Sequence, residues 1–149
     1  MGSTISKKKI NYKKISEYLV LWAIGGCIYY GIEMIFRGFS HWSMFILGGL
    51  CMQFFTWQGQ ITDWKDSLFR QILRCTIFVV SMEFVTGIIV NKWYHMNVWD
   101  YSSMPFQLFG QICLPFALIF SGLCVVGIFL SGYLLHWLYG EPLPHYRVR

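Results

Sequence analysis

Charged residues are scarce in this sequence of 149 amino acids: Asp, Glu, Lys and Arg together make up 13%. A soluble domain usually carries about 25%, because its surface must face water. Hydrophobic residues account for 56% and aromatic residues for 19%, and Trp and Tyr collect where hydrocarbon meets lipid headgroups. The scarcity of charge therefore excludes an ordinary soluble domain and predicts an integral membrane protein in contact with the lipid bilayer.

The motifs of catalysis, metal binding and nucleotide binding are also missing. The chain has no HExxH, GxSxG or GxxxxGK[ST] sequence and no Cys/His pattern with ligand spacing. Its five cysteines form no CxxC pair, and most lie inside apolar runs, so they favour packing over disulfides. We therefore expect no enzyme, no metal and no cofactor. Any ATPase that works with this protein is a separate chain.

Basic residues outnumber acidic ones by twelve to seven, but their positions argue against nucleic acid as a partner. Five of the twelve lie in residues 1–14, as Lys7–Lys9, Lys13 and Lys14. A basic segment beside a membrane span sets orientation and contacts anionic lipid, so we interpret residues 1–14 as a cytoplasmic segment. The opening Met-Gly-Ser-Thr-Ile-Ser also fits the short N-myristoylation pattern, which does not establish lipidation.

Four apolar runs are candidates for membrane spans, which predicts an all-α bundle of four transmembrane helices. Within a single domain of residues 15–137, the helices are expected at about 15–36, 42–57, 72–90 and 112–135. The second run is shorter than the roughly 20 residues that a hydrocarbon core requires. It sits upright, borrows residues from its flanks or crosses a locally thinned bilayer. Alternatively it is re-entrant, which leaves three spans. The polar residues 58–71 are expected to form a loop or a short interfacial helix, and residues 138–149 a cytoplasmic tail.

The distribution of Lys and Arg orients this bundle. With the N-terminus inside, ten basic residues lie on or near the cytoplasmic side and only Arg37 and Lys92 lie outside. A bias of this kind sets topology, and it argues against a dual-topology dimer. We expect a multi-pass protein of the cell membrane with both termini in the cytoplasm.

A charge inside a predicted span costs a few kcal/mol and needs a partner or a cavity, and two carboxylates raise this question. Glu33 precedes Arg37 by four residues, so the two side chains share a helix face. Glu83 lies about 10 Å below the outer surface, judged from the rise per residue of a helix. Three interpretations stay open: an ion pair that fastens the first and third helices, an outward-facing polar pocket that binds a headgroup, an ion or a small solute, and Glu83 facing water.

Residues 91–111 join the last two spans and are rich in aromatic residues and turn formers. Trp99 and Tyr101 are expected to anchor this segment at the interface, while Pro105 and Gly110 permit tight turns. We expect an aromatic hairpin on the outer face, between the third and fourth helices, that covers the polar residues. The candidate cluster comprises Glu33, Arg37, Glu83, Asp100 and Tyr101, with His41, His95, Gln107 and Gln111 as secondary members.

Glycines recur in the first, second and fourth predicted spans. In lipid, helices associate by close packing, and glycine lets their backbones approach. The glycines therefore predict either packing inside the bundle or a homo-oligomer seam.

The segment of residues 99–114 reads Trp99-Asp100-Tyr101-Ser102, then Pro105-Phe106, then Gly110 and Ile112-Cys113-Leu114. This pattern resembles the bacterial CmpB-like family described as "putative ABC-transporter type IV". The resemblance covers about residues 18–137, and Glu33 and Glu83 match the family's intramembrane acidic positions. Members usually carry Asn and Arg where this chain has Gln107 and Gln111, which leaves Arg37 as the local counter-charge. The resemblance implies a compact multi-span membrane protein.

Three functions are compatible with these observations. The first is a permease-like protein, or one that binds a lipid or solute in the outward-facing polar pocket. The second is a non-transporting subunit that stabilises or regulates a partner membrane protein, or a homo-oligomer. The third, an intramembrane enzyme with Glu83, Asp100 or a histidine as general base, has the least support, because no positioned nucleophile or metal motif accompanies these residues.

Overall fold

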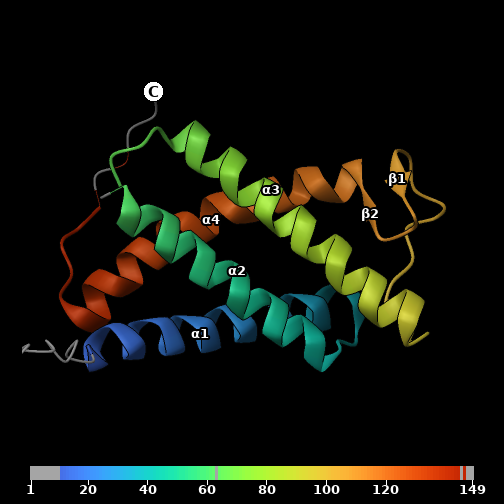
Figure 1. The fold of residues 1–149 in the computed structure, drawn as a ribbon, viewed down its shortest axis with the longest axis horizontal. Helices are drawn as coiled ribbons and strands as arrows, with labels where there is room; N and C mark the ends of the chain where they lie inside the picture. Colours follow the sequence, from blue (N-terminus) through green and yellow to red (C-terminus); the bar gives the residue numbers. More distant parts are fainter. Residues whose placement is uncertain (1–10, 63, 145, 147–149) are drawn as a thin grey trace, which may run out of the picture.

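The computed structural model describes residues 11–62, 64–144 and 146. Long helices dominate the described chain and run back and forth along its long axis (Figure 1). They are α1 (Tyr12–Arg37), α2 (Trp42–Ile61), α3 (Leu68–Gly87) and α4 (Leu114–Tyr139). A π-helix, η1 (Ile88–Trp93), continues α3, and a short antiparallel hairpin of β1 (Gln107–Leu108) and β2 (Ile112–Cys113) precedes α4.

The helix ends follow from local sequence signals. The Asn11 side chain accepts a hydrogen bond from the Lys14 N–H and so caps the start of α1. Ser67 does the same for the start of α3. At the other ends of α1 and α4, Gly38 and Gly140 adopt positive φ values of 75° and 69°, the left-handed conformation in which glycine commonly terminates helices.

Three helical segments of the described chain are long and apolar enough to cross a membrane: Tyr12–Arg37, Leu68–Trp93 and Leu114–Tyr139. Their mean hydropathies are 1.7, 1.9 and 2.3. Large hydrophobic side chains stay exposed along them, for example Phe36 at 82% and Leu118 at 65%. An apolar surface of this extent requires hydrocarbon around it. The chain is therefore a multi-pass membrane protein.

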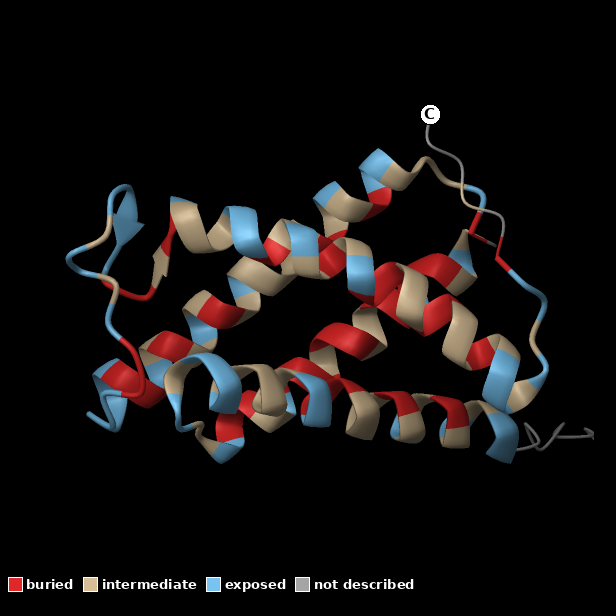
Figure 2. Ribbon diagram, turned by 180° about the vertical axis from the view of Figure 1, so that it is seen from behind, coloured by how far each residue is buried: buried red, intermediate tan, exposed pale blue. Residues whose placement is uncertain are grey.

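Helix α2 packs against α1, α3 and α4. It is not among the three segments whose length and hydropathy suffice to cross a membrane. More than half of its residues are buried, among them Thr56 and Gln58 (Figure 2). A methyl group placed on Gly25 or Gly48 would meet the backbone of the other helix at 2.9 Å, so glycines bring α1 and α2 into close contact. A methyl group placed on Gly127 of α4 would instead meet a side chain, the ring of Phe55. These glycines pack inside the bundle, as the first of the two interpretations predicted.

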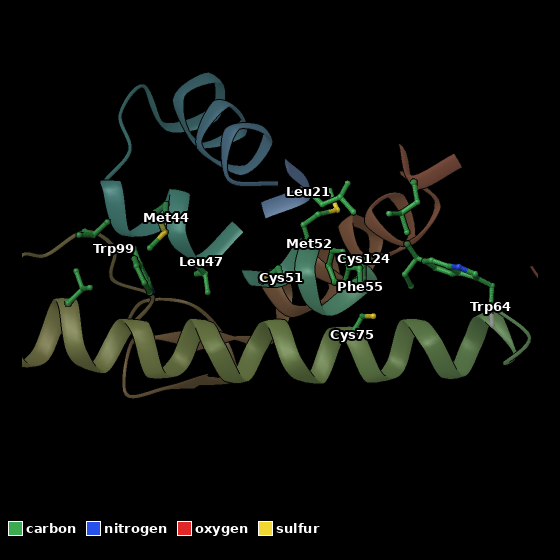
Figure 3. Close-up of a cluster of buried hydrophobic side chains, with 14 residues drawn as sticks. Leu21, Met44, Leu47, Cys51, Met52, Phe55, Trp64, Cys75, Trp99 and Cys124 are labelled. Carbon is green, nitrogen blue, oxygen red and sulfur yellow. The ribbon is translucent and has the colours of Figure 1, made fainter. Parts of the chain in front are cut away.

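The hydrophobic core contains four of the five cysteines as free thiols. Cys51, Cys75 and Cys124 come from three different helices and lie close to Phe55 (Figure 3). The fifth, Cys27, is exposed on α1.

The boundaries of the second and third helices differ from the prediction. Helix α2 continues four residues further, to Ile61, and α3 begins four residues earlier, at Leu68. Residues 58–71 are thus mostly helical rather than a loop or an interfacial helix. Buried side chains explain the difference, because Gln58 donates to Gln71 at 3.1 Å and Arg74 donates to Gln58 at 3.1 Å. Polar residues that bond across two helices do not need to face water.

The predicted tail also begins later than expected. Helix α4 continues to Tyr139, and the chain then folds back along it. The Tyr146 hydroxyl donates to the Ile128 carbonyl oxygen at 3.0 Å, and its ring packs edge-on against Phe129 at 4.3 Å. Part of the predicted cytoplasmic tail is therefore packed on the bundle.

Candidate functional site at the hairpin end of the bundle

The end of α1, the start of α2, η1, the β-hairpin and the start of α4 lie at one end of the molecule, here called the hairpin end (Figure 1). The backbone of this region is unusual. His95, Asn97, Phe106 and Phe109 all have φ values between 50° and 53°, a conformation that is uncommon outside glycine. Strained backbone conformations cluster at functional sites, so this end of the bundle is a candidate location for a functional site.

Arg37 joins α1 to the segment that follows η1. One guanidinium nitrogen, Nη1, lies 2.7 Å from Oε2 of Glu33, and Nη2 donates to the carbonyl oxygen of Val98. The same guanidinium stacks over the Phe39 ring at 4.6 Å. The Glu33–Arg37 pair is therefore present, but it fastens α1 to residue 98 and not to α3.

Glu83 has a different partner. This carboxyl is 4% exposed, and its Oε1 accepts a hydrogen bond from the Tyr101 hydroxyl at 3.3 Å. The Tyr101 ring stacks on Phe116 at 4.7 Å, nearly parallel to it. Burial raises the pKa of the Tyr101 hydroxyl, which therefore keeps its proton and acts as donor. The contact links α3, α4 and the hairpin segment.

A buried hydrogen-bond network holds the base of the hairpin. The Asn91 amide donates to Oε1 of Gln111 at 2.7 Å and accepts from the Val98 N–H at 2.7 Å. The Trp99 indole N–H donates to the Gln111 carbonyl at 2.9 Å. Gly87 of α3 makes room for these groups, because a methyl group there would meet Gln111 and Trp99. Asn91 belongs to the π-helix, a rare element that often occurs at functional sites.

A polar pocket of about 230 Å³ opens beside this network. Its lining includes Lys92, Asn97, Asp100, Gln107 and Gln111. The pocket lining does not include Glu33, Arg37, Glu83 or Tyr101. The predicted cluster is thus divided in two: an internal set of contacts around Arg37 and Tyr101, and a pocket around Asp100.

Asp100 is held as a carboxylate in this pocket. The Ser102 side chain and the Ser102 N–H, at 2.9 Å, both donate to its Oδ1. These two bonds, together with the nearby charge of Lys92, lower the pKa of Asp100. Gly110 has a φ of 70°, and a methyl group on it would lie 2.8 Å from the same oxygen. Glycine is therefore required beside the carboxylate.

The remaining predicted residues have local roles. The His41 ring accepts from the Ser43 N–H at 3.3 Å and caps α2, while His95 is exposed. The Gln107 side chain accepts from the Gly110 N–H at 2.6 Å and so stabilises the turn of the hairpin. Among the described residues, no group of three or more His, Cys, Asp or Glu side chains is placed to hold a metal ion.

Comparison with known proteins agrees with this architecture. The family model described as "Putative ABC-transporter type IV" matches residues 11–144. The chain belongs to this family. No curated protein and no solved structure matches it. The resemblance carried by residues 99–114 is confirmed, and the match extends beyond residues 18–137 at both ends.

The Gln111 side chain is buried in this type IV protein. Gln111 is 2% exposed, and both ends of its amide are bonded, to Asn91 and to the Phe109 carbonyl at 3.0 Å. A neutral amide can be satisfied there without a counter-charge. Arg37 is not the only cation of the region, because Lys92 attracts Asp100.

Sequence reasoning missed several residues of this type IV protein. Asn91 and Asn97 were read only as turn formers, and Lys92 only as a topology signal. Glu17 was also missed, although it is 1% exposed within α1, at the end of the bundle away from the hairpin. Its oxygens lie 3.9 Å from the Lys13 ammonium and 3.6 Å from that of Lys14. Buried carboxylates of the helices therefore occur toward both ends of the bundle, not only toward the hairpin end.

Proposed function

We propose that this protein is a four-span, permease-like membrane protein that binds a small zwitterionic group in the polar pocket at its hairpin end. The observation that carries this proposal is the joint presence of Lys92 and Asp100 in one pocket. Opposite charges fixed in one cavity are complementary to a ligand that carries an anion and an ammonium together. The amides of Asn97 and Gln107 supply further donors and acceptors.

The topology in this proposal includes α2 as the fourth span. Helix α2 has 20 residues, which at 1.5 Å per residue gives about 30 Å, the thickness of a hydrocarbon core. Its lower apolarity is tolerable because Thr56 and Gln58 are buried within the bundle and not in lipid. The bias of basic residues supports a cytoplasmic N-terminus, and so an outward-facing pocket in the cell membrane.

Two sources supply the same zwitterionic chemistry: the headgroup of an ethanolamine phospholipid, and a free solute such as an amino acid. In both, Lys92 binds the phosphate or carboxylate and Asp100 binds the ammonium. Arg37 and Glu33 do not compete for the ligand, because the Arg37 guanidinium already binds both the Glu33 carboxylate and the Val98 carbonyl oxygen.

Binding to purified protein in detergent tests the proposal. The probes are glycerophosphoethanolamine, glycine, glycerol phosphate and ethanolamine, measured by calorimetry. We expect glycerophosphoethanolamine or glycine to bind. Glycerol phosphate and ethanolamine, which each carry charge of one sign only, should bind at least about tenfold more weakly, a loss of about 1.4 kcal/mol. Binding of glycerophosphoethanolamine without glycine indicates a lipid headgroup, and the reverse result indicates a free solute.

Matched substitutions locate the site. Lys92→Gln and Asp100→Asn each remove one charge from the pocket, and both should abolish the preference for zwitterions. Lys65→Gln removes a lysine in the α2–α3 connection, at the other end of the molecule, and should leave binding unchanged. Equal binding by wild type and both pocket variants would refute the proposal. If no probe binds and the protein co-purifies with another membrane protein, the subunit role replaces it.

A further inference from the structure

An apolar groove lies between α1, α2 and α4, separate from the polar pocket. Its volume is about 110 Å³, and its lining includes Ile28, Tyr29, Ile32, Phe120, Leu123 and Val126. Two of these side chains are exposed on the bundle surface, Ile28 at 41% and Val126 at 60%. The groove therefore opens sideways, on the surface that the apolar helices α1 and α4 present to the bilayer.

The groove exists because α1 and α4 diverge. The two helices meet at the end away from the hairpin, where the hydroxyl groups of Ser16 and Tyr139 lie 2.7 Å apart. They separate toward the hairpin end (Figures 1 and 2). Phe55 of α2 is positioned against Gly127 and fills only part of the space between them.

An apolar void of this size does not suit water, which needs two to four polar partners. Cavities lined by aliphatic and aromatic side chains stay dry and accept apolar molecules. Left empty, the groove would deprive its lining of dispersion contacts. The surrounding medium at the level of the spans is hydrocarbon, so a lipid chain is the apolar group that can reach the groove.

We propose that the groove holds one acyl chain of a membrane phospholipid. An aromatic path leads from the groove toward the polar pocket. The Phe120 ring, which lines the groove, lies 6.4 Å from that of Phe116, and Phe116 stacks on Tyr101 at 4.7 Å. Asp100, the residue immediately before Tyr101 in the sequence, lines the pocket. This inference rests on the proposed function and specifies its ligand: a zwitterionic phospholipid with its chain in the groove and its headgroup at the hairpin end.

Photocrosslinking tests the groove directly. The protein is reconstituted in vesicles of the anionic lipid phosphatidylglycerol that contain phosphatidylethanolamine with a diazirine near the middle of one acyl chain, and crosslinked peptides are identified by mass spectrometry. Crosslinks should concentrate in residues 25–32 and 120–130. Excess unlabelled phosphatidylethanolamine should reduce them several-fold. Crosslinks spread evenly over all exposed apolar positions, without saturation, would show annular lipid only and overturn the inference.

Two tryptophan variants provide a matched comparison. Val126→Trp places a large ring at the mouth of the groove, whereas Leu118→Trp adds the same ring on the exposed surface of α4 outside the groove lining. The first variant should lose the groove crosslinks several-fold, and the second should retain them. Should Val126→Trp fail to fold, Ile28→Trp closes the same mouth from α1. Full retention of groove crosslinks in a folded blocking variant would also overturn the inference.

The two proposals fail in different ways. Glycerophosphoethanolamine has no acyl chain, so the blocking variant should bind it like wild type. Localised crosslinks with no binding of either glycerophosphoethanolamine or glycine would leave the groove standing and refute the zwitterion pocket. Binding of the soluble probe with unlocalised crosslinks would refute the groove alone.

Discussion

The hydroxyl of Tyr101 lies 3.3 Å from Oε1 of Glu83. This bond joins the hairpin segment to a buried carboxyl of α3, while the stack of Tyr101 on Phe116 joins the same segment to α4. The position of Asp100 in the polar pocket therefore depends on a neighbour that is held at both its ring and its hydroxyl. The Glu83–Tyr101 contact is best understood as a support for the pocket.

Replacement of Tyr101 by Phe separates these two contributions. The Tyr101→Phe variant keeps the stack on Phe116 but loses the hydrogen bond, so the free energy of unfolding in detergent should fall by about 1 kcal/mol. Glu83→Gln should lose less, because an amide oxygen still accepts the bond from the Tyr101 hydroxyl. Thermal unfolding of both variants measures the difference. A larger loss for Glu83→Gln than for Tyr101→Phe would contradict the role given to this contact.

The apolar runs were sufficient to predict a mostly helical protein with long apolar helices, because the roughly 20-residue length of a span is a strong constraint. The predicted end of α2 and the predicted start of α3 were wrong because Gln58 and Gln71 are polar residues typical of loops, but they bond to each other in the bundle. Hydropathy assigns such residues to loops, since it has no term for a partner 13 positions away.

Some residues that line the polar pocket could be named from the sequence and others could not. Asp100, Gln107 and Gln111 lie in the pocket lining because the turn-rich segment of residues 99–114 folds locally. Asn91 and Lys92 reach the same pocket from the end of the third span. Their approach depends on a π-helical turn that no sequence signal specified.

Asn91 and Gln111 should be energetically coupled. Asn91→Leu and Gln111→Leu each leave a buried polar partner without its bond, which costs about 1–3 kcal/mol. In the double variant the two orphaned groups are both gone. The double loss should therefore be smaller than the sum of the single losses by at least about 0.5 kcal/mol. Chemical unfolding of the four proteins in one detergent completes the cycle, and strict additivity would argue that the 2.7 Å contact contributes nothing.

Asp66, between α2 and α3, should make the stability of the protein against unfolding depend on pH in the acid range. The Arg74 guanidinium, 2.8 Å away, and the Ser67 N–H lower the pKa of Asp66. A carboxyl whose folded pKa is depressed contributes stability above its unfolded pKa, about 3.9, and loses it as pH falls through the folded value. Wild type should therefore melt at a higher temperature than Asp66→Asn at pH 7, and the difference should shrink as the pH falls below the unfolded pKa of about 3.9.

A neighbouring ion pair provides the control for that measurement. Arg70 lies 3.8 Å from Asp66, but its side chain is 78% exposed, and exposed pairs contribute little. Arg70→Gln should keep the wild-type melting temperature at pH 7. A melting-temperature difference between wild type and Asp66→Asn that does not shrink as the pH falls below about 3.9 would show that the carboxylate charge is not the cause.

The membrane topology can be read from three single cysteines placed in a variant without the native ones. Phe39 precedes α2, Lys65 follows it and Ser102 lies in the hairpin segment. If α2 crosses the bilayer and the hairpin end faces outward, an impermeant maleimide should label Phe39→Cys and Ser102→Cys in intact cells, and Lys65→Cys only after the membrane is opened. A re-entrant α2 predicts a different result, because the cysteines at 39 and 65 would then be labelled from the same side. Labelling of Lys65→Cys alone in intact cells would reverse the orientation and place the polar pocket in the cytoplasm.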